Sequence, residues 1–315
     1  MRVLFVTNMY PTEAEPWIGC FVKDLEEDLT ALGFNIRVFA FDGRSDWKTY
    51  IRVMPSLRSL IRRERVDLIH AHYGLTGVVA LTQRDLPVVT TFYGPEYTGQ
   101  LPWQIWISYV VARLSTPIVV SPEGALRLRS FGASVIPSGV DMELFQPIDR
   151  NDARCALGWS QHRRYVLFPS ARMRRGKGTA LFDAAFAELS QVDPDVEAVS
   201  LEGYTRADTG LVLNAVDVML VTSYWEGSPR AVRESLACMT PVVSVPVGDV
   251  AQVLEALPGC AVLPRGPQAL ARGVLESFNV SRDPALRRRA AETCRRRMAR
   301  LTADVYSRAA RKNNK

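Results

Sequence analysis

Short runs of apolar, often β-branched residues alternate along the chain with longer stretches whose apolar residues recur every three or four positions. The short runs are typical of buried strands, and the longer pattern is typical of helices that cover a sheet. Strands that alternate with helices predict right-handed βαβ units and parallel sheets. In the first half we predict strands Val3–Thr7, Ile36–Phe41, Leu68–His72, Val88–Phe92, Ile118–Ser121 and Ser134–Pro137, and helices Val22–Leu32, Val53–Arg63, Gly74–Gln83, Pro102–Ala112 and Pro122–Ser130.

The second half repeats this alternation after a stretch with no strand pattern. That stretch contains Pro147, Gly158 and a run of charges, and we place an interdomain linker in it at residues 146–152. Two similar halves predict an α/β protein with two Rossmann-like, doubly wound parallel-sheet domains that face each other across a cleft. In the second half we predict strands Tyr165–Pro169, Ala198–Leu201, Val218–Thr222, Val242–Val245 and Ala261–Leu263, and helices Thr179–Leu189, Arg230–Cys238, Val250–Ala256, Pro267–Ser277 and most of Pro284–Arg311.

This pattern divides the chain into three parts. We expect the first Rossmann-like domain to span residues 1–148 and the second to span residues 149–300. Residues 301–315 would form a helical tail that could pack back on the first domain. In open α/β sheets ligands bind at the carboxyl ends of the strands, so the cleft is the expected ligand site.

The composition of the 315 residues is that of an ordinary globular protein. Hydrophobic residues make up 47% and charged residues 23%, which excludes disordered and fibrous proteins. No apolar run reaches the roughly 18–20 residues of a membrane span, and the N-terminal apolar run is too short for a signal peptide, so we expect a cytoplasmic protein. Five cysteines without a CxxC pair argue against a disulfide framework or a thiolate zinc site.

The net charge is +6, from 39 Lys and Arg against 33 Asp and Glu. This excess leaves nucleic acid, anionic lipid and phosphate-bearing small substrates open as partners. The chain shows no recognised nucleic-acid module, so we expect no nucleic-acid partner. The arginine-rich residues 287–300, together with the aromatic segment Trp103–Val111, could contact an anionic membrane surface. The alternatives are a solvated helix for the arginines and a core helix for the aromatic segment.

The richest set of candidate side chains follows the predicted strand Val218–Thr222. Glu226 lies in the strand-to-helix loop, and Glu234 lies about one turn inside the next helix, whose first turn begins near Pro229. A carboxylate suits the vicinal diol of a ribose, and a second one nearer the loop could orient a sugar ring. The free N–H groups at the helix start, residues 228–231, can receive phosphate oxygens.

The spacing of Glu226 and Glu234, in the motif Glu-Gly-x-Pro-x4-Glu-x-Leu-Ala-Cys-x-x-Pro-Val-Val, resembles that of retaining GT-B glycosyltransferases of the GT4-type family (glycosyl transferases group 1). Further motifs follow in the order found in that family, over nearly the whole chain. The resemblance is closest to teichuronic-acid and exopolysaccharide-type members. The other motifs are Asp67–His72, Val135–Asp141 with Phe145 and Pro147, Arg172 with Lys177 in Ser170–Gly178, and Val247–Val250.

This resemblance implies a retaining, metal-independent glycosyltransferase of the hexosyltransferase type, which needs no cofactor beyond its UDP- or GDP-sugar donor. The first domain would bind the acceptor, a saccharide or lipid-linked saccharide of cell-envelope or exopolysaccharide biosynthesis, and the second the donor. The protein would be cytoplasmic, with a peripheral position on the inner face of the cytoplasmic membrane as the open alternative. The implied catalytic residues are Glu226, His72, Arg172 and Lys177, and the implied substrate-binding residues are Gly19, Gly227, Ser228, Pro229, Arg230 and Glu234.

The two histidines of the predicted strand Leu68–His72 point to the same face of its sheet, because they lie two positions apart. A metal site would need a third ligand, and no cysteine or acidic cluster lies nearby in the sequence, so we expect no metal. We expect His72, nearer the carboxyl end, to contact the donor sugar, and His70 to be structural.

Two positions depart from the family pattern. A single glycine, Gly19, followed by Cys20, stands where the family often has two glycines, and Tyr93 stands where it has a histidine. Both changes lie on the acceptor side. They motivate a second hypothesis, a non-catalytic sugar-nucleotide-binding partner subunit of the same fold.

Overall fold

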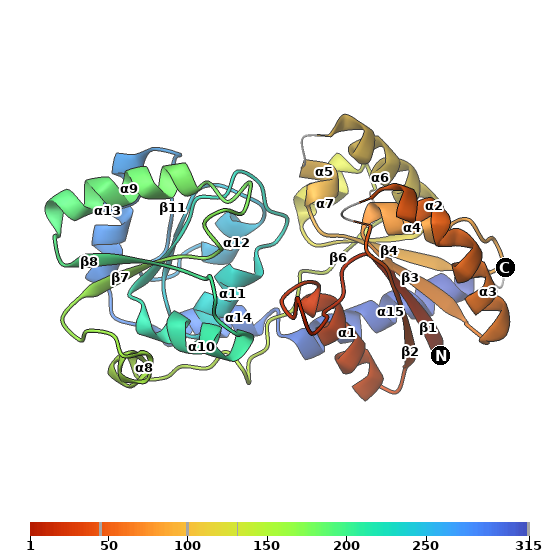
Figure 1. Ribbon diagram of the computed structural model, residues 1–315, viewed down its shortest axis with the longest axis horizontal. Helices are drawn as coiled ribbons and strands as arrows, with labels where there is room; N and C mark the ends of the chain where they lie inside the picture. Colours follow the sequence, from red (N-terminus) through yellow and green to blue (C-terminus); the bar gives the residue numbers. More distant parts are fainter. Residues whose placement is uncertain (44–45, 99–100, 131, 314–315) are drawn as a thin grey trace. The chain divides into compact units, whose positions relative to one another are not determined.

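The computed structural model of the chain describes residues 1–43, 46–98, 101–130 and 132–313. The chain forms two units (Figure 1). The first unit comprises Met1–Gly139 and Arg295–Lys315, and the second comprises Val140–Cys294.

The first unit contains a parallel sheet with the strand order β2-β1-β3-β4-β5-β6. Its strands are β1 (Arg2–Thr7), β2 (Asn35–Ala40), β3 (Leu68–His72), β4 (Val88–Phe92), β5 (Thr116–Val119) and β6 (Ser134–Val135). Its helices are α1 (Cys20–Ala31), α2 (Lys48–Arg52), α3 (Met54–Arg63), α4 (Gly74–Ala80), α5 (Pro95–Thr98), α6 (Pro102–Leu114), α7 (Pro122–Arg127) and α15 (Arg295–Asn313).

Helices cover both faces of this sheet, because successive side chains of a strand point to opposite faces. From β1, Val3 and Phe5 pack in one cluster with residues of α1 and α15. Leu4 and Val6 pack in another cluster with residues of α2, α3 and α4. Figure 1 shows α1 and α15 on one side of the sheet and α2, α4 and α6 on the other.

The second unit contains a parallel sheet with the strand order β11-β10-β9-β7-β8. Its strands are β7 (Arg164–Phe168), β8 (Val196–Ser200), β9 (Val218–Val221), β10 (Val242–Ser244) and β11 (Ala261–Val262). Its helices are α8 (Arg150–Leu157), α9 (Thr179–Val192), α10 (Arg206–Ala215), α11 (Arg230–Ala237), α12 (Val250–Leu254), α13 (Pro267–Phe278) and α14 (Pro284–Ala291).

Both sheets reverse their strand order at one place, between β1 and β3 in the first and between β7 and β9 in the second. The loops that follow two such strands leave on opposite faces, so their carboxyl ends form the crevice in which open α/β sheets bind ligands. The predicted α/β class with two doubly wound parallel sheets is confirmed.

The predicted linker at residues 146–152 is wrong, because α8 begins within it. The Asp149 side chain accepts the Asn151 N–H at 2.8 Å, which is a helix N-cap, and Gly158 ends the helix with φ 70°. Before this helix, Val140 and Phe145 are already buried in the core of the second unit. The units therefore divide at Gly139, upstream of the boundary expected at residue 148.

Helical structure covers most of Pro284–Arg311, as predicted. It is two helices, α14 and α15, separated near Cys294, which pairs with Val140 as an isolated parallel bridge. The chain re-enters the first unit at Arg295, upstream of the tail expected from residue 301. From there α15 packs on α1 and on the β1 residues described above.

Candidate functional site

The loops that follow β7 and β9, the two strands at the reversal point of the second sheet, are bonded to each other. The Tyr224 N–H donates to the Gly176 carbonyl at 2.8 Å, and the Thr222 hydroxyl donates to the Lys177 carbonyl at 3.0 Å. Gly178 has φ 72°, and a Cβ there would lie 2.1 Å from the Thr222 carbonyl oxygen, so glycine is required. The two loops are therefore held together at the carboxyl edge of the sheet.

Lys177 and Glu226, one from each of these loops, form an ion pair. The Nζ atom of Lys177 lies 2.5 Å from Oε1 of Glu226, and the two side chains are 20% and 16% exposed. A partly buried pair of opposite charges is screened less by water than a surface pair. The cation and the carboxylate expected for phosphate and sugar thus lie side by side at this edge.

The segment from Gly227 to Pro229 connects Glu226 to the start of α11. The carbonyl oxygen of Gly227 is approached so closely by Gly248 (φ 54°) that a Cβ on Gly248 would lie 2.6 Å from it. Ser228 is buried, and among the described residues its hydroxyl has no hydrogen-bond partner. The first N–H groups of a helix have no partner within that helix, so this helix start offers backbone donors beside an unpartnered hydroxyl.

A buried ion pair fixes α11 to the loop after β10. The Nη2 atom of Arg233 lies 2.6 Å from Oδ2 of Asp249, and the two side chains are 3% and 5% exposed. Asp249 belongs to a motif that the sequence singled out, but no spacing rule predicts its partner. This pair sets the position from which the first turn of α11 presents its N–H groups.

Glu234 and Arg230 lie one turn apart on α11 and form a second pair. Their closest atoms, Nη2 of Arg230 and Oε1 of Glu234, are 3.4 Å apart, and both side chains are mostly buried. Glu234 can accept hydrogen bonds from the hydroxyls of a bound ligand, because a carboxylate has two acceptor oxygens.

Arg172 contacts a different partner from the rest of the predicted set. Its guanidinium forms an ion pair with Asp183 of α9 and lies over the rings of Phe168 and Phe182. Its backbone carbonyl accepts the Thr179 hydroxyl at 2.7 Å. The structure therefore brings Lys177 to Glu226 and Arg230 to Glu234, while Arg172 is turned towards α9. Among its neighbours, Arg174 and Arg175 are exposed.

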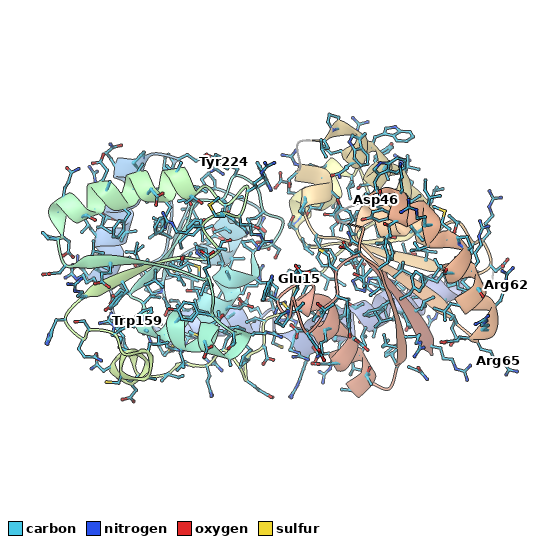
Figure 2. All side chains as sticks on the ribbon, in the orientation of Figure 1. Glu15, Asp46, Arg62, Arg65, Trp159 and Tyr224 are labelled. Carbon is cyan, nitrogen blue, oxygen red and sulfur yellow. The ribbon has the colours of Figure 1, made fainter. Side chains whose placement is uncertain are left out.

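Arg265, which the sequence analysis did not single out, holds the loop that carries Glu226. Its guanidinium donates to the carbonyls of Thr222 at 3.3 Å and Ser223 at 2.6 Å, and it lies over the Tyr224 ring. Tyr224 is labelled in Figure 2, on the upper side of the second unit. Arg265 follows the short strand β11, and this position at the carboxyl edge is the only signal that could have identified it.

In the first unit, His72 ends β3 at the reversal point and is fully buried. Its Nδ1 atom is hydrogen-bonded to the Tyr93 hydroxyl at 2.7 Å, whereas Nε2 is buried and has no partner among the described residues. Burial is the main cause that holds the pKa of His72 well below its usual value, and repulsion from the neighbouring His70 lowers this pKa further. The ring is therefore neutral. The unpartnered Nε2 is the remaining hydrogen-bonding atom of this side chain.

His70 is bonded at both ring nitrogens. Nδ1 lies 2.7 Å from the Tyr306 hydroxyl of α15, and Nε2 lies 2.7 Å from the Thr91 hydroxyl of β4. Burial lowers the pKa of His70 to about 3. These contacts join β3 to its neighbouring strand and to α15, which is a structural role.

Glu96 is a buried carboxyl group beside Tyr93. It accepts the N–H groups of Tyr93 at 3.0 Å and Gly94 at 2.9 Å, which fixes the turn after β4. Burial raises the pKa of Glu96 to about 7, although these backbone hydrogen bonds act in the opposite direction.

Gly19 lies at the start of α1 with φ 67°. A Cβ at this position would lie 2.3 Å from the carbonyl oxygen of Met9, in the same β1–α1 loop. The loop's own backbone therefore requires glycine here, independently of any ligand.

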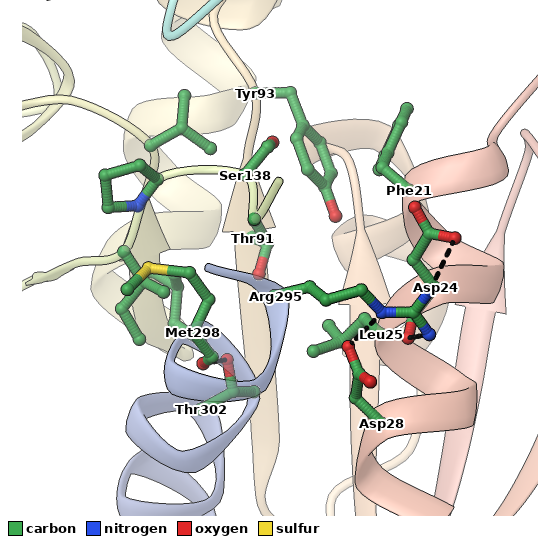
Figure 3. Close-up of a pocket in the computed structure, with 15 residues that line it drawn as sticks. Phe21, Asp24, Leu25, Asp28, Thr91, Tyr93, Ser138, Arg295, Met298 and Thr302 are labelled. Carbon is green, nitrogen blue, oxygen red and sulfur yellow. Dashed lines mark hydrogen bonds and ion pairs between the residues drawn. The ribbon is translucent and has the colours of Figure 1, made fainter. Parts of the chain in front are cut away.

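A small pocket of about 50 Å³ lies within the first unit between the starts of α1 and α15 and the ends of β4 to β6 (Figure 3). Arg295, the first residue of α15, reaches across it to Asp28 at 2.7 Å and to Asp24 at 3.6 Å. Tyr93 also lines the pocket. Among the described residues no group of three His, Cys, Asp or Glu side chains is placed to hold a metal ion.

Two family models match the chain, one in each half. The model described as Glycosyltransferase Family 4 matches residues 3–144, and the model described as Glycosyl transferases group 1 matches residues 170–279. A Bacillus subtilis protein described as a teichuronic acid biosynthesis glycosyltransferase, TuaC, is 25% identical over 87% of this chain and 88% of its own. The D-inositol 3-phosphate glycosyltransferase of Mycobacterium marinum is 29% identical over 69% of this chain, which spans 57% of that protein.

Solved structures share the fold over nearly the whole chain. Sucrose-phosphate synthase from Thermosynechococcus elongatus has a TM-score of 0.81 with 18% identity, and 98% of each chain is covered. Anabaena HepE, solved with UDP and glucose, has a TM-score of 0.69 with 17% identity, over 98% of this chain and 99% of its own. The predicted GT-B architecture is confirmed by these likenesses together with the two parallel sheets.

Proposed function

Because the chain belongs to glycosyltransferase family 4, we propose that it transfers a sugar, with retention of configuration and without a metal ion, from a nucleoside-diphosphate sugar to a saccharide or lipid-linked saccharide. The transfer of a sugar from a nucleotide sugar is the activity of this family. The donor sugar, the acceptor and the stereochemistry are the specific parts of the proposal.

The observation that carries this proposal is the contact of Lys177 with Glu226 at the reversal point of the second sheet. In a nucleoside-diphosphate sugar the bond that breaks joins the sugar to the phosphate. The side chain that binds the sugar and the side chain that binds the phosphate must therefore lie next to each other. A cation and a carboxylate 2.5 Å apart, beside the start of α11, meet that requirement.

We assign the remaining second-unit residues by what each can donate or accept. Glu234 would accept hydrogen bonds from the two ribose hydroxyls. These bonds would replace its ion pair with Arg230. The backbone N–H groups of Gly227, Ser228 and Arg230 and the Ser228 hydroxyl would donate to the diphosphate, and Pro229, which has no N–H, would shape the turn between them. Arg172 would add a second cation when its guanidinium leaves Asp183.

The chemistry that follows from these roles is electrostatic. As the sugar–phosphate bond breaks, negative charge grows on the departing diphosphate and positive charge on the anomeric carbon. Lys177 and Arg172 would stabilise the first, and Glu226 would stabilise the second. The departing phosphate would take the proton of the acceptor hydroxyl on the same sugar face, which accounts for retention.

From the first unit we propose His72 as a contact of the donor sugar, through Nε2, and Gly19 as a position where backbone approaches the reacting centre. Because Nε2 is buried, a sugar hydroxyl can reach it only after the side chains that cover it move.

We propose a hexose on UDP or GDP as the donor and a cell-envelope or exopolysaccharide acceptor. The support comes from relatives: HepE is solved with UDP-glucose, and TuaC is described as acting in teichuronic acid biosynthesis. We place the protein in the cytoplasm, peripheral on the inner face of the membrane.

A thermal-shift screen of nucleotide sugars tests the donor. A ligand at about 100 times its Kd adds about 2.7 kcal/mol to the stability of the folded state. UDP- or GDP-sugars should raise the melting temperature, and nucleoside monophosphates should raise it less. No shift with any nucleotide sugar would contradict the proposal.

Slow hydrolysis of the bound donor without an acceptor separates the enzyme from a non-catalytic partner subunit. The enzyme should release free sugar and nucleoside diphosphate, and the Glu226→Gln protein should not. Tight donor binding with no hydrolysis and no transfer would favour the partner subunit.

A further inference from the structure

Helices α2 and α6 expose large apolar side chains on the same face of the first sheet. Both helices pack against α4, which lies between them and is itself largely buried (Figure 1). Two tryptophans, Trp47 directly before α2 and Trp106 within α6, are 63% and 67% exposed. The exposed apolar side chains of this region are Trp47, Ile51, Leu101, Trp103, Trp106 and Leu114.

The same helices carry only positive charge. Residues 47–63, which contain α2 and α3, include five Lys and Arg and no Asp or Glu. Helix α6 contains Arg113 and no acidic residue. Lys48, Arg52 and Arg113 are exposed; Arg52 forms an exposed ion pair with Asp46 at 2.9 Å, which leaves its guanidinium accessible to solvent, and Figure 2 shows Arg62 at the outer edge of α3. An apolar surface flanked by cations is complementary to an anionic lipid surface.

Three of the seven arginines in residues 287–300, the other candidate for lipid contact, bind other parts of the protein. Arg287 donates to the carbonyls of Phe145 and Ala237 at 2.8 and 2.7 Å. Arg289 donates to the Gln252 carbonyl at 2.9 Å, and Arg295 is paired with acidic residues of α1. These guanidinium groups hold helices in place and are not available to phosphates of a bilayer.

We propose that an aromatic–basic surface on the first unit, formed by α2 and α6, docks the protein on a bilayer that contains anionic lipid. Its members are Trp47, Lys48, Ile51, Arg52, Trp103, Trp106, Arg113 and Leu114. Tryptophan rings favour the headgroup region, where the indole N–H stays hydrated and the ring is apolar. In the described part of the chain no helix is long and apolar enough to cross a membrane. Contact is therefore with the lipid surface.

This inference deepens the proposed function, because the docking surface would bring the protein to a lipid-linked acceptor. Its evidence is independent of the donor site, since it comes from exposure and charge on α2 and α6. The two can therefore fail separately.

Vesicle co-sedimentation of the full chain, without donor or acceptor, tests the surface. The vesicles are phosphatidylcholine alone and equal parts of phosphatidylcholine and phosphatidylglycerol. We expect binding to the mixed vesicles, weaker binding in high salt and little binding to phosphatidylcholine alone. Equal binding to both vesicles, or none to either, would overturn the proposal.

Two variants locate the binding. The double variant Trp103→Ser, Trp106→Ser should weaken binding about ten-fold or more, because each buried aromatic side chain adds apolar area. The double variant Lys48→Gln, Arg52→Gln should weaken it about five-fold per charge, on anionic vesicles only. The matched controls are Trp17→Ser, at an equally exposed tryptophan of the β1–α1 loop, and Arg163→Gln, at an exposed arginine of the second unit.

The controls should bind vesicles like the unaltered chain. If they lose as much binding as the surface variants, the binding is unspecific and the proposal is wrong. If light scattering shows a dimer that the tryptophan variant converts to a monomer, while vesicle binding is unchanged, a second copy of the chain covers this surface instead. Circular dichroism melting confirms that each variant is folded.

Discussion

The hydroxyl of Tyr93 lies 2.7 Å from Nδ1 of His72 and is the hydrogen-bond partner of that ring within the described residues. A neutral imidazole carries its proton on one nitrogen only, so Nε2 donates if Nδ1 accepts from the Tyr93 hydroxyl and accepts if Nδ1 donates to it. Tyr93 is also one of the two positions at which the sequence departs from the motif pattern that it resembles. The tautomer of His72 is thus coupled to its hydrogen bond with Tyr93.

Tyr93→Phe should remove this coupling. We expect transfer to fall by up to about ten-fold, the scale of one lost hydrogen bond, with little change in donor affinity. Long-range proton–nitrogen spectra measure the tautomer directly, and the chain has only three histidines. The His72 signals should change while those of His162 stay in place. Unaltered His72 signals would show that Tyr93 does not set the tautomer. The Tyr93→His variant should restore transfer in part.

Glu226→Gln keeps the shape of the side chain and removes its charge. If this carboxylate stabilises positive charge at the anomeric carbon, the rate of transfer should fall roughly 100-fold or more. Donor affinity, measured by calorimetry, should change little. Glu197→Gln, at an exposed pair in the same unit, is the control and should be fully active. Unchanged turnover of the Glu226 variant would remove this residue from the mechanism.

Lys177 and Arg172 should contribute differently to binding of the nucleoside diphosphate, because Lys177 is paired with Glu226 and Arg172 with Asp183. Lys177→Gln should weaken binding of the nucleoside diphosphate about ten-fold, since it removes a charge-assisted contact. Asp183→Asn should strengthen it by at most about five-fold, because an exposed pair is worth no more than about 1 kcal/mol and Arg172 would no longer have to leave it. Calorimetry with the diphosphate measures both. Weaker binding by the Asp183 variant would argue that Arg172 does not turn to the phosphates.

The buried pair of Arg233 and Asp249 should matter for stability. Removing one partner leaves the other charge buried without compensation, which costs about 3–5 kcal/mol. Arg233→Met should therefore lower the melting temperature by many degrees. Arg163→Gln, at an exposed pair, should change it by very little. A small effect at Arg233 would mean that water reaches Asp249.

Glu96 should make stability depend on pH between 4.5 and 7. Its pKa is raised from 4.5 to about 7 in the folded chain, so the folded state holds a proton that the unfolded state has released. The stabilising contribution of this proton is complete below pH 4.5 and is lost as pH rises through 7, by at most about 1.4 kcal/mol per pH unit. The difference in stability between the unaltered chain and Glu96→Gln, from denaturant unfolding at several pH values, should shrink over this range. A constant difference would show that the carboxyl group is ionised throughout.

Much of the fold could be predicted because the strands are buried on both faces and read as apolar runs. Leu68–His72 and Val88–Phe92 are strands with the predicted bounds. Helices α8 and α10 were missed because their polar faces hide the helical period, although Asp149 and Thr205 are N-caps that the sequence shows. The charged residues around these two N-caps favour a loop in a sequence-based prediction, although each cap marks the start of a helix.

Part of the site could be predicted because its residues follow strands that the sequence reveals. Lys177 and Glu226 each follow a strand, so both were expected at one sheet edge, but the ion pair between them depends on the β7–β9 adjacency. The pairings of Arg265 with loop carbonyls and of Arg233 with Asp249 depend on tertiary packing alone. No periodicity or motif spacing in the sequence encodes them.

The order in which the two units fold during synthesis follows from the position of α15. The second unit is one continuous segment, Val140–Cys294, and can complete its core before synthesis ends. The first unit cannot, since the face of its sheet that α1 and α15 share is only partly covered until α15 has emerged. Nascent chains arrested just before Arg295 should therefore contain a protease-resistant second unit and a first unit that is still digestible, the reverse of the usual N-to-C order of domain folding.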